Sequence, residues 1–157
     1  MPNGAVSVQM ATPRGIAAVR ARVRAGRVGA TFKQFLDQVY AAARSGAIEL
    51  DGQNIFVYRN VADSPEAIDV EFGVGTKAPF SAVGQVMYSQ LPVGEVATIT
   101  HWGSYAELDG AHNAIWAWCK EHDRTPSGVR WEVYGHWTND SSQLRTDVFY
   151  LLESLSS

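Results

Sequence analysis

The chain has 157 residues, a formal net charge of −3 and a hydrophobic content of 46%. This length and apolar content are enough for one full-sized core, and they argue against an intrinsically disordered protein. The slightly negative charge argues against a general nucleic-acid-binding protein, which normally carries a basic face. Cys119 is the only cysteine, so no intrachain disulfide can form, and a reducing compartment is expected.

The first half of the chain predicts two strands, a helix and two further strands. The strands at the start flank a Thr12-Pro13-Arg14 turn, and the helix is predicted from apolar residues at helical spacing, beginning with Phe32. Arg20, Arg22 and Arg24 alternate along one strand, a pattern typical of a solvated edge strand. The expected elements are strands over 5–11 and 15–23, a helix over 29–44, and strands over 55–59 and 67–74.

The second half predicts the same order of elements. A turn containing Pro92 separates the first two strands, and Leu108, Ala111, Ile115 and Trp118 form the apolar stripe of the helix. The expected elements are strands over 83–91 and 94–102, a helix over 105–122, and strands over 129–137 and 144–152.

Short segments of the first half recur in the second half at nearly constant spacing, which favours duplication of one structural unit. Segments 13–15, 55–58 and 68–70 correspond to segments 92–94, 131–134 and 146–148. We therefore expect a single α+β domain over residues 1–157, with repeats at about 5–75 and 83–153, an antiparallel sheet and both helices on one face. The symmetry breaks where Glu132 takes the place of Phe56.

Three motifs carry a resemblance that covers almost the whole chain. They are Gly103-Ser104-Tyr105 before a helix, Trp131-Glu132-Val133-Tyr134 on a strand, and Leu144-Arg145-Thr146-Asp147-Val148 on the last strand. In this order, the motifs resemble the GyrI-like small-molecule-binding family, whose fold also forms the effector-binding domains of BmrR- and Rob-type multidrug regulators.

The resemblance implies two strand-helix-strand-strand (SHS2-type) modules around a pseudo-two-fold axis. It further implies a groove between the helices and the sheet that takes hydrophobic, often cationic, small molecules. The central glutamate of the family matches Glu132, and its aromatic residue matches Tyr105. The chain shows no DNA-binding segment, so direct DNA binding is not expected, and the bulky His112 and Trp116 predict a narrower pocket.

Glu132 is the first candidate site residue. Strand alternation places it on one face with Arg130 and Tyr134, opposite Trp131 and Val133. A carboxylate among aromatic rings is poorly solvated, so its pKa should rise, and it could pair with a cation or act as a general acid or base. The alternative is a solvated glutamate paired with Arg130 or Arg145.

The other candidate ligand-binding residues are aromatic or lie beside aromatic residues. His112 and Trp116 are four positions apart and share one helix face. The sequence does not decide whether Phe149 or Tyr150 faces the pocket. The full set of candidates is Glu132, Trp102, Tyr105, His112, Trp116, Tyr134, Tyr58 and Tyr150. The four histidines lack the spacing of a metal site, so no metal and no cofactor are expected.

Three functions remain open on the sequence. The leading hypothesis is a standalone binder of hydrophobic or cationic small molecules. The second is a cofactor-independent hydrolase of cyclopropane-bearing electrophiles, in which Glu132 moves a proton and Tyr105 orients water. The third is a protein-interaction module, for example one acting on a topoisomerase.

The sequence also suggests where the protein resides. The N-terminal residues lack the basic segment and apolar stretch of a signal peptide, and no segment approaches the ~20 apolar residues of a membrane helix. We expect a cytoplasmic protein without a membrane partner. An exposed sheet edge could pair two chains into a homodimer.

Overall fold

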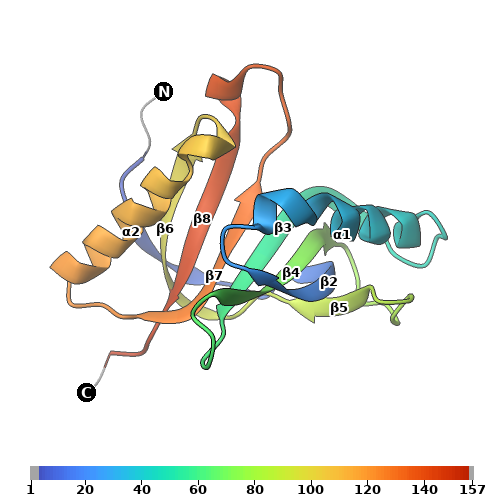
Figure 1. The fold of residues 1–157 in the computed structure, drawn as a ribbon, viewed down its shortest axis with the longest axis horizontal. Helices are drawn as coiled ribbons and strands as arrows, with labels where there is room; N and C mark the ends of the chain where they lie inside the picture. Colours follow the sequence, from blue (N-terminus) through green and yellow to red (C-terminus); the bar gives the residue numbers. More distant parts are fainter. Residues whose placement is uncertain (1–3, 156–157) are drawn as a thin grey trace. The chain divides into compact units, whose positions relative to one another are not determined.

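The computed structural model describes residues 4–155, and the chain divides into two compact units. Pro13–Leu91 forms one, called here the central unit; Pro92–Ser157 forms the other with the N-terminal segment through Thr12, called here the terminal unit. Figure 1 shows one long helix in each unit, α1 and α2. Among the described residues, no helix is both long enough and apolar enough to cross a membrane.

The central unit packs α1 against an antiparallel sheet with the strand order β3-β4-β2-β5. Leu36, Val39 and Ala42 are the buried positions of the helix, and their spacing of three residues gives one apolar stripe. Its elements are β2 (Gly15–Arg24), α1 (Val28–Ala43), β3 (Leu50–Asn60), β4 (Ala67–Thr76) and β5 (Met87–Gln90).

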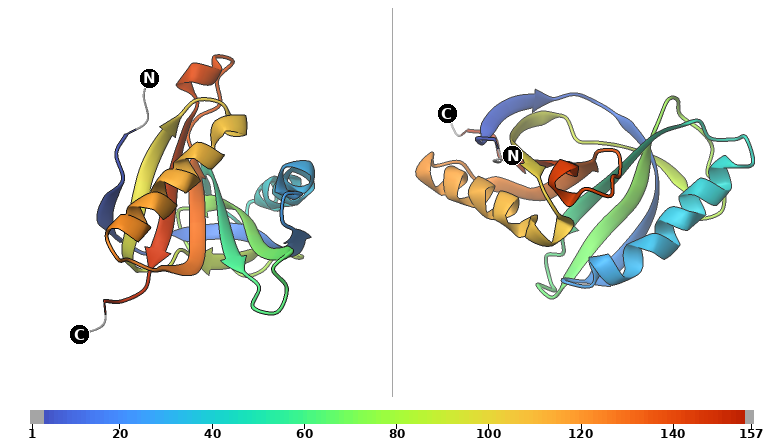
Figure 2. Two further views of the ribbon diagram at one scale, coloured as in Figure 1. Left: turned by 60° about the vertical axis from the view of Figure 1, so that its left-hand side comes forward. Right: turned by 90° about the horizontal axis from the view of Figure 1, so that it is seen from above.

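The terminal unit packs α2 against an antiparallel sheet with the order β1-β6-β8-β7, and Figure 2 shows the helix crossing one face of these strands. Ala111, Ile115 and Cys119 of the helix join Val148 and Tyr150 of the sheet in one core. The elements are β1 (Ser7–Ala11), β6 (Gly94–Trp102), the 3-10 helix η1 (Tyr105–Glu107), α2 (Asp109–Glu121), β7 (Pro126–Tyr134), the 3-10 helix η2 (Ser141–Gln143) and β8 (Arg145–Leu152).

The α+β class expected from the sequence is confirmed, and the two units share one strand order. Each has a short edge strand, β5 or β1, beside the strand that precedes its helix. β1 pairs with β6 rather than with the strand that follows it, so the N-terminal segment belongs to the terminal unit. Pro13 lacks an N–H to continue a ladder, and there the chain leaves β1 and enters the central unit.

Four predicted elements change their bounds by three residues or more. The strand expected over 55–59 extends to Leu50–Asn60. The helix expected over 105–122 divides at Leu108 into η1 and α2. The strand expected over 83–91 shortens to β5, because Gly84 adopts a positive φ of 59° in a tight turn closed by the Val83–Val86 bridge. The strand expected over 129–137 begins earlier, at Pro126, and ends at Tyr134.

The arginine pattern of β2 also has a structural explanation. The strand is internal over Gly15–Ala18, where β5 pairs with it, but the described ladder beyond Ala18 continues with β4 alone. Arg20 and Arg22 are therefore at an open edge, as the sequence predicted, and they face Glu71 and Asp69 across the β2–β4 ladder.

Candidate functional site

Glu132 lies on β7 and is directed toward α2 of the same unit. The residue is only 5% exposed, so its carboxylate is removed from bulk water. Its Oε2 lies 2.7 Å from Nε2 of His112, and its Oε1 accepts a hydrogen bond from the hydroxyl of Tyr134. The interpretation of Glu132 as a solvated strand residue is therefore wrong, because β7 turns this side chain into the space beneath the helix.

The hydrogen bonds continue from Glu132 through His112 to Tyr150. Nδ1 of His112 lies 2.6 Å from the Tyr150 hydroxyl, which also receives a hydrogen bond from the Trp116 side chain. An ionised carboxylate can only accept, so a neutral His112 must donate from Nε2 and accept at Nδ1. The donors then run in one direction, from Trp116 to Tyr150, from Tyr150 to His112 and from His112 to Glu132.

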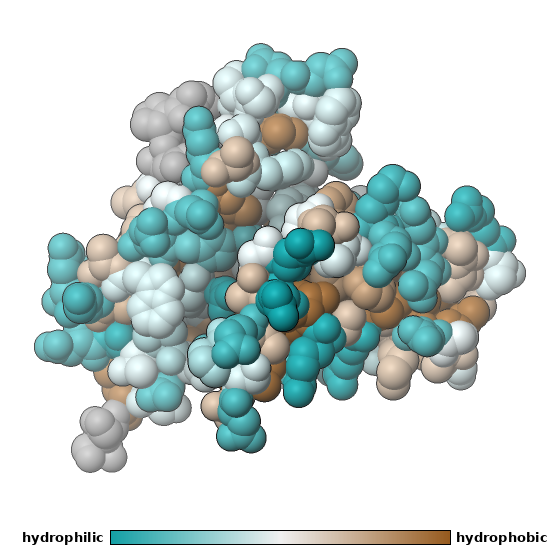
Figure 3. Space-filling model, viewed as in Figure 1, coloured by the Kyte–Doolittle hydropathy of each residue, from teal (hydrophilic) through white to brown (hydrophobic). Residues whose placement is uncertain are grey.

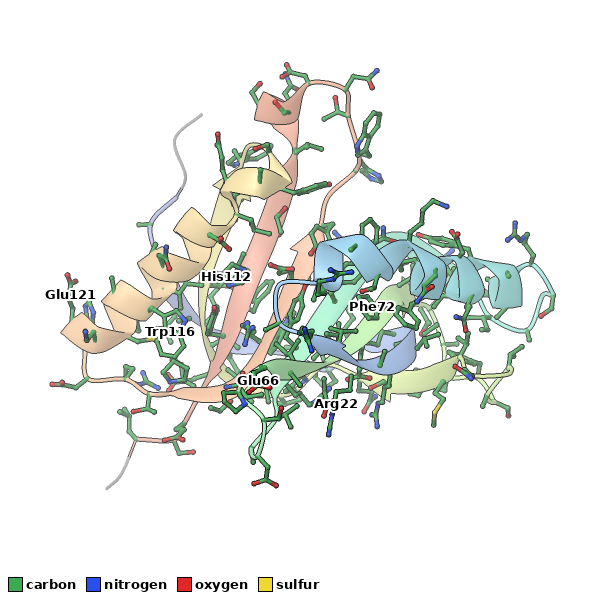
Figure 4. All side chains as sticks on the ribbon, viewed as in Figure 1. Arg22, Glu66, Phe72, His112, Trp116 and Glu121 are labelled. Carbon is green, nitrogen blue, oxygen red and sulfur yellow. The ribbon has the colours of Figure 1, made fainter. Side chains whose placement is uncertain are left out.

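Aromatic rings surround this buried chain on the side of α2. Tyr105 packs edge-on against Tyr134 at 5.6 Å, and Trp116 packs edge-on against Tyr150 at 5.9 Å. Tyr105 is 42% exposed and Trp116 is 53% exposed, whereas Tyr150 is 4% exposed. The site thus has a polar, buried interior and an accessible aromatic rim, and Figure 4 shows His112 and Trp116 on the same helix.

The low polarity of the site changes the ionisation of its tyrosines. Burial raises the pKa of Tyr105 above its usual value. Burial also raises the pKa of Tyr150, although the nearby Arg130 opposes this shift. The guanidinium carbon of Arg130 lies 6.0 Å from the centre of the Tyr150 ring, within cation–π range. Both phenols therefore remain neutral hydrogen-bonding groups near neutral pH.

The structure decides the orientation of the last strand, which the sequence left open. Phe149 stacks on Trp131 with ring centres 5.5 Å apart, whereas Tyr150 belongs to the core beneath α2. Successive side chains of a strand point to opposite faces, so Tyr150 shares the face of Glu132 and Phe149 does not.

Two further predicted site residues, Trp102 and Tyr58, are on β6 and β3. Trp102 ends β6, and the guanidinium carbon of Arg145 lies 5.7 Å from its ring centre. Arg145 also donates to Asp147 over 3.2 Å, which gives this arginine a local carboxylate of its own. Tyr58 is buried on β3 in the central unit.

The central unit has aromatic packing where the repeat comparison matches Phe56 to Glu132. Phe56 packs edge-on against Phe72 at 5.2 Å, and Phe35 stacks on Phe72 at 4.9 Å. Phe72, labelled in Figure 4, is fully buried. Phenylalanine rings thus fill this part of the core, which agrees with the expected difference between the halves.

Sequence reasoning missed a second buried carboxylate, Glu71 on β4. Glu71 is 2% exposed, and its carboxylate accepts hydrogen bonds from Arg59 and, over 3.4 Å, from Arg20. Burial by itself would raise the pKa of Glu71, but hydrogen bonds from Ser89 and Arg59 and the charges of both arginines bring it below its usual value. The alternation of Arg20 and Arg22 on one segment and of Asp69 and Glu71 on another could have indicated these ion pairs.

The surface differs between the two units. Figure 3 shows brown, apolar groups below α1 over β2 and β4, whereas the surface over α2 is mostly pale to teal. The exposed rings of Tyr105 and Trp116 carry polar atoms as well as apolar faces. The rim of the Glu132 site is therefore aromatic and polar rather than aliphatic.

The sequence model of the family described as "GyrI-like small molecule binding domain" matches residues 5–152. The chain belongs to this GyrI-like family. The match spans both compact units, so the family's domain includes α1, α2 and all the strands of the described chain. Among curated proteins, none matches the sequence significantly.

Solved structures show the same GyrI-like fold. The crystal structure of the EcmrR C-terminal domain has a TM-score of 0.81 at 15% identity, with 99% of this chain and 100% of that chain covered. SAV2435 bound to tetraphenylphosphonium has a TM-score of 0.72 at 11% identity, with 98% and 94% covered. A hydrolase from Listeria innocua has a TM-score of 0.66 at 10% identity, with 98% and 94% covered.

Proposed function

We propose that this GyrI-like domain binds hydrophobic cations at the Glu132 site of the terminal unit. One observation carries the proposal: a carboxylate that is 5% exposed is held by His112 and the Tyr134 hydroxyl beneath an accessible aromatic rim. His112 and the Tyr134 hydroxyl hold the carboxylate in a fixed position, and the aromatic rim beside it offers ring faces to an organic cation.

A lipophilic cation would be attracted to the Glu132 carboxylate without entering as a hydrated ion. The attraction between opposite charges is several-fold stronger in a partly buried site than in water. The exposed faces of Tyr105 and Trp116 add apolar contact and cation–π attraction worth about 0.5–2 kcal/mol for each ring. Glu132 thus acts as the electrostatic anchor, and the rim rings act as walls.

The hydrogen-bonded chain explains how the site can respond to a ligand. Because Glu132 is covered by His112, a cation approaching from the rim first meets Tyr105 and Trp116. Rotation of the His112 ring would release Oε2 of the carboxylate and also break the bond to Tyr150. Binding is therefore expected to rearrange His112, and the exposure of Trp116 makes its fluorescence a suitable signal.

The test compares two ions of nearly equal shape and opposite charge. Tetraphenylphosphonium is the cation bound to the similar protein SAV2435, and tetraphenylborate is its anionic counterpart. Titration by tryptophan fluorescence and calorimetry should show tighter binding of the cation by the wild type. Glu132→Gln should weaken cation binding at least tenfold, a loss of about 1.4 kcal/mol or more. The exposed Glu121, labelled in Figure 4, provides the control variant Glu121→Gln, which should change affinity less than twofold.

Cation binding that survives Glu132→Gln would overturn the anchor role. The same proteins also test the hydrolase alternative, with mass spectrometry of a cyclopropane-containing DNA alkylator. A product heavier by one water, formed over many turnovers by the wild type and lost in Glu132→Gln, would replace the binding proposal with a catalytic one. Unchanged compound together with saturable quenching supports binding.

A further inference from the structure

A hollow lies beside the C-terminal half of α2, at the segment that leads into β7. Its volume is about 470 Å³, and it is bordered by Trp116, Cys119 and Lys120 of the helix and by Arg124 and Pro126 of the following segment. The backbone N–H of Arg124 donates to the Cys119 carbonyl over 2.9 Å, which holds this segment against the helix end. Figure 4 shows Trp116 between α2 and this segment.

Arg124 is the unusual residue of the hollow. Its side chain is only 10% exposed, and its Nη2 donates to Glu95 over 2.7 Å. Its Nε is buried and has no hydrogen-bond partner among the described residues. A buried donor without an acceptor costs about 1–3 kcal/mol, so Arg124 has hydrogen-bonding capacity that Glu95 does not use.

The remaining groups of the hollow define the rest of the ligand. Lys120 is exposed and adds a second positive charge. Glu95 does not line the hollow, but its carboxylate already engages Arg124. The indole N–H of Trp116 donates a hydrogen bond to the Tyr150 hydroxyl, so the two faces of the ring provide an apolar surface. Two cations against one carboxylate favour an anion, and the indole favours a flat, apolar ring.

Cys119 does not give the hollow a nucleophile. The residue is 2% exposed, and burial raises its pKa although the charge of Arg124 opposes the shift. A thiol with a raised pKa is mostly protonated near neutral pH and is a poor nucleophile. The hollow is therefore suited to reversible binding.

We propose that this hollow binds a small aromatic carboxylate, with its anion on Arg124 and Lys120 and its ring on Trp116. This site prefers an anion, whereas the Glu132 site is proposed to prefer a cation. Anion binding in the hollow does not depend on the function proposed for the Glu132 site. The two sites are neighbours that share Trp116, but their anchoring groups differ, because Glu132 meets α2 at His112 whereas Arg124 and Lys120 line the hollow.

The test uses 2-naphthoate and its neutral analogue 2-naphthalenemethanol, titrated calorimetrically against the folded full chain. The wild type should bind naphthoate saturably and at least tenfold more tightly than the alcohol. Arg124→Met should weaken naphthoate binding at least tenfold, and Lys120→Gln should weaken it about two- to fivefold because an exposed charge contributes less. Lys33→Gln on α1, an exposed lysine paired with Asp37, is the control and should leave binding unchanged.

Glu95→Gln keeps the test decisive even where loss of Arg124 unfolds the protein. The substitution removes the competing negative charge and retains an acceptor for Arg124, so naphthoate should bind about threefold more tightly or better. A merely structural Arg124–Glu95 pair predicts no such gain. Equal binding of naphthoate and the alcohol, or unchanged naphthoate affinity in Glu95→Gln, overturns the proposal. Glu132→Gln should not weaken naphthoate binding, and a loss there would assign the probe to the Glu132 site and overturn the assignment to this hollow.

Discussion

Replacing Tyr150 with phenylalanine removes one buried oxygen from the hydrogen-bonded chain and changes little else. The hydroxyl lies 2.6 Å from Nδ1 of His112 and also accepts a hydrogen bond from the Trp116 side chain. Trp116 is 53% exposed, so its N–H can turn to water at small cost, but His112 loses its inner partner. A buried polar atom left unpaired costs about 1–3 kcal/mol, so we expect the free energy of unfolding to fall by about 2 kcal/mol.

Urea denaturation followed by near-ultraviolet circular dichroism measures this change directly. For a chain of this size, about 2 kcal/mol corresponds to a fall in Tm of roughly 4–8 °C. Tyr88→Phe is the matched control, because the Tyr88 hydroxyl accepts only an exposed hydrogen bond of 3.2 Å from Gln90 in the described hydrogen-bond network. Tyr88→Phe should lower the free energy of unfolding by less than about 0.5 kcal/mol.

A double-mutant cycle then isolates the contact between Tyr150 and His112. If the two side chains form one network, Tyr150→Phe and His112→Phe should show a coupling energy of about 0.5–3 kcal/mol. Strict additivity of the two substitutions, or a Tyr150→Phe cost equal to that of Tyr88→Phe, would refute the proposed chain of donors.

Three further predictions concern buried groups. Glu132→Gln should stay within about 1 kcal/mol of the wild-type free energy of unfolding. Glu132→Ala should lose about 2–5 kcal/mol, because the Tyr134 and His112 donors lose their acceptor, and equal losses for the two variants in chemical denaturation would contradict this account. Because the pKa of folded Glu71 lies below its unfolded value of about 4.3, its stabilising effect is present above that pH and is lost as pH falls through the folded pKa. Glu71→Gln should therefore have a lower free energy of unfolding than the wild type at pH 7, and the difference should shrink in acid. A difference that stays constant across that pH range would contradict this prediction. Ile115→Ala should cost about 2–5 kcal/mol because this side chain is fully buried beneath α2, and thermal denaturation without a clear fall in Tm would count against that packing.

Local sequence patterns predicted both helices to within a residue or a short 3-10 turn, because an amphipathic stripe depends only on residues three and four positions apart. The same is true of β7, where alternation placed Glu132 and Tyr134 on one face opposite Trp131. A hydrogen bond between Tyr134 and Glu132 and a stack between Trp131 and Phe149 confirm that alternation.

Pairings between distant segments required the tertiary structure. The predicted site included His112, but nothing in the helical pattern indicated that its two ring nitrogens would join Glu132 to Tyr150. Glu71 was missed for the same reason, because its partners Arg20 and Arg59 are on two other strands. A partner for a buried charge is chosen by strand register, which a single segment does not encode.

By itself, the sequence determined the α+β class and the family, and it singled out Glu132 as the first candidate site residue. The tertiary structure decided that β1 pairs with β6, that Tyr150 rather than Phe149 lies beneath α2, and that Arg124 is buried with an unpaired Nε. The division has one physical cause. Periodicity and residue type act along the chain, whereas burial and hydrogen-bond partners depend on which distant segments fold against each other.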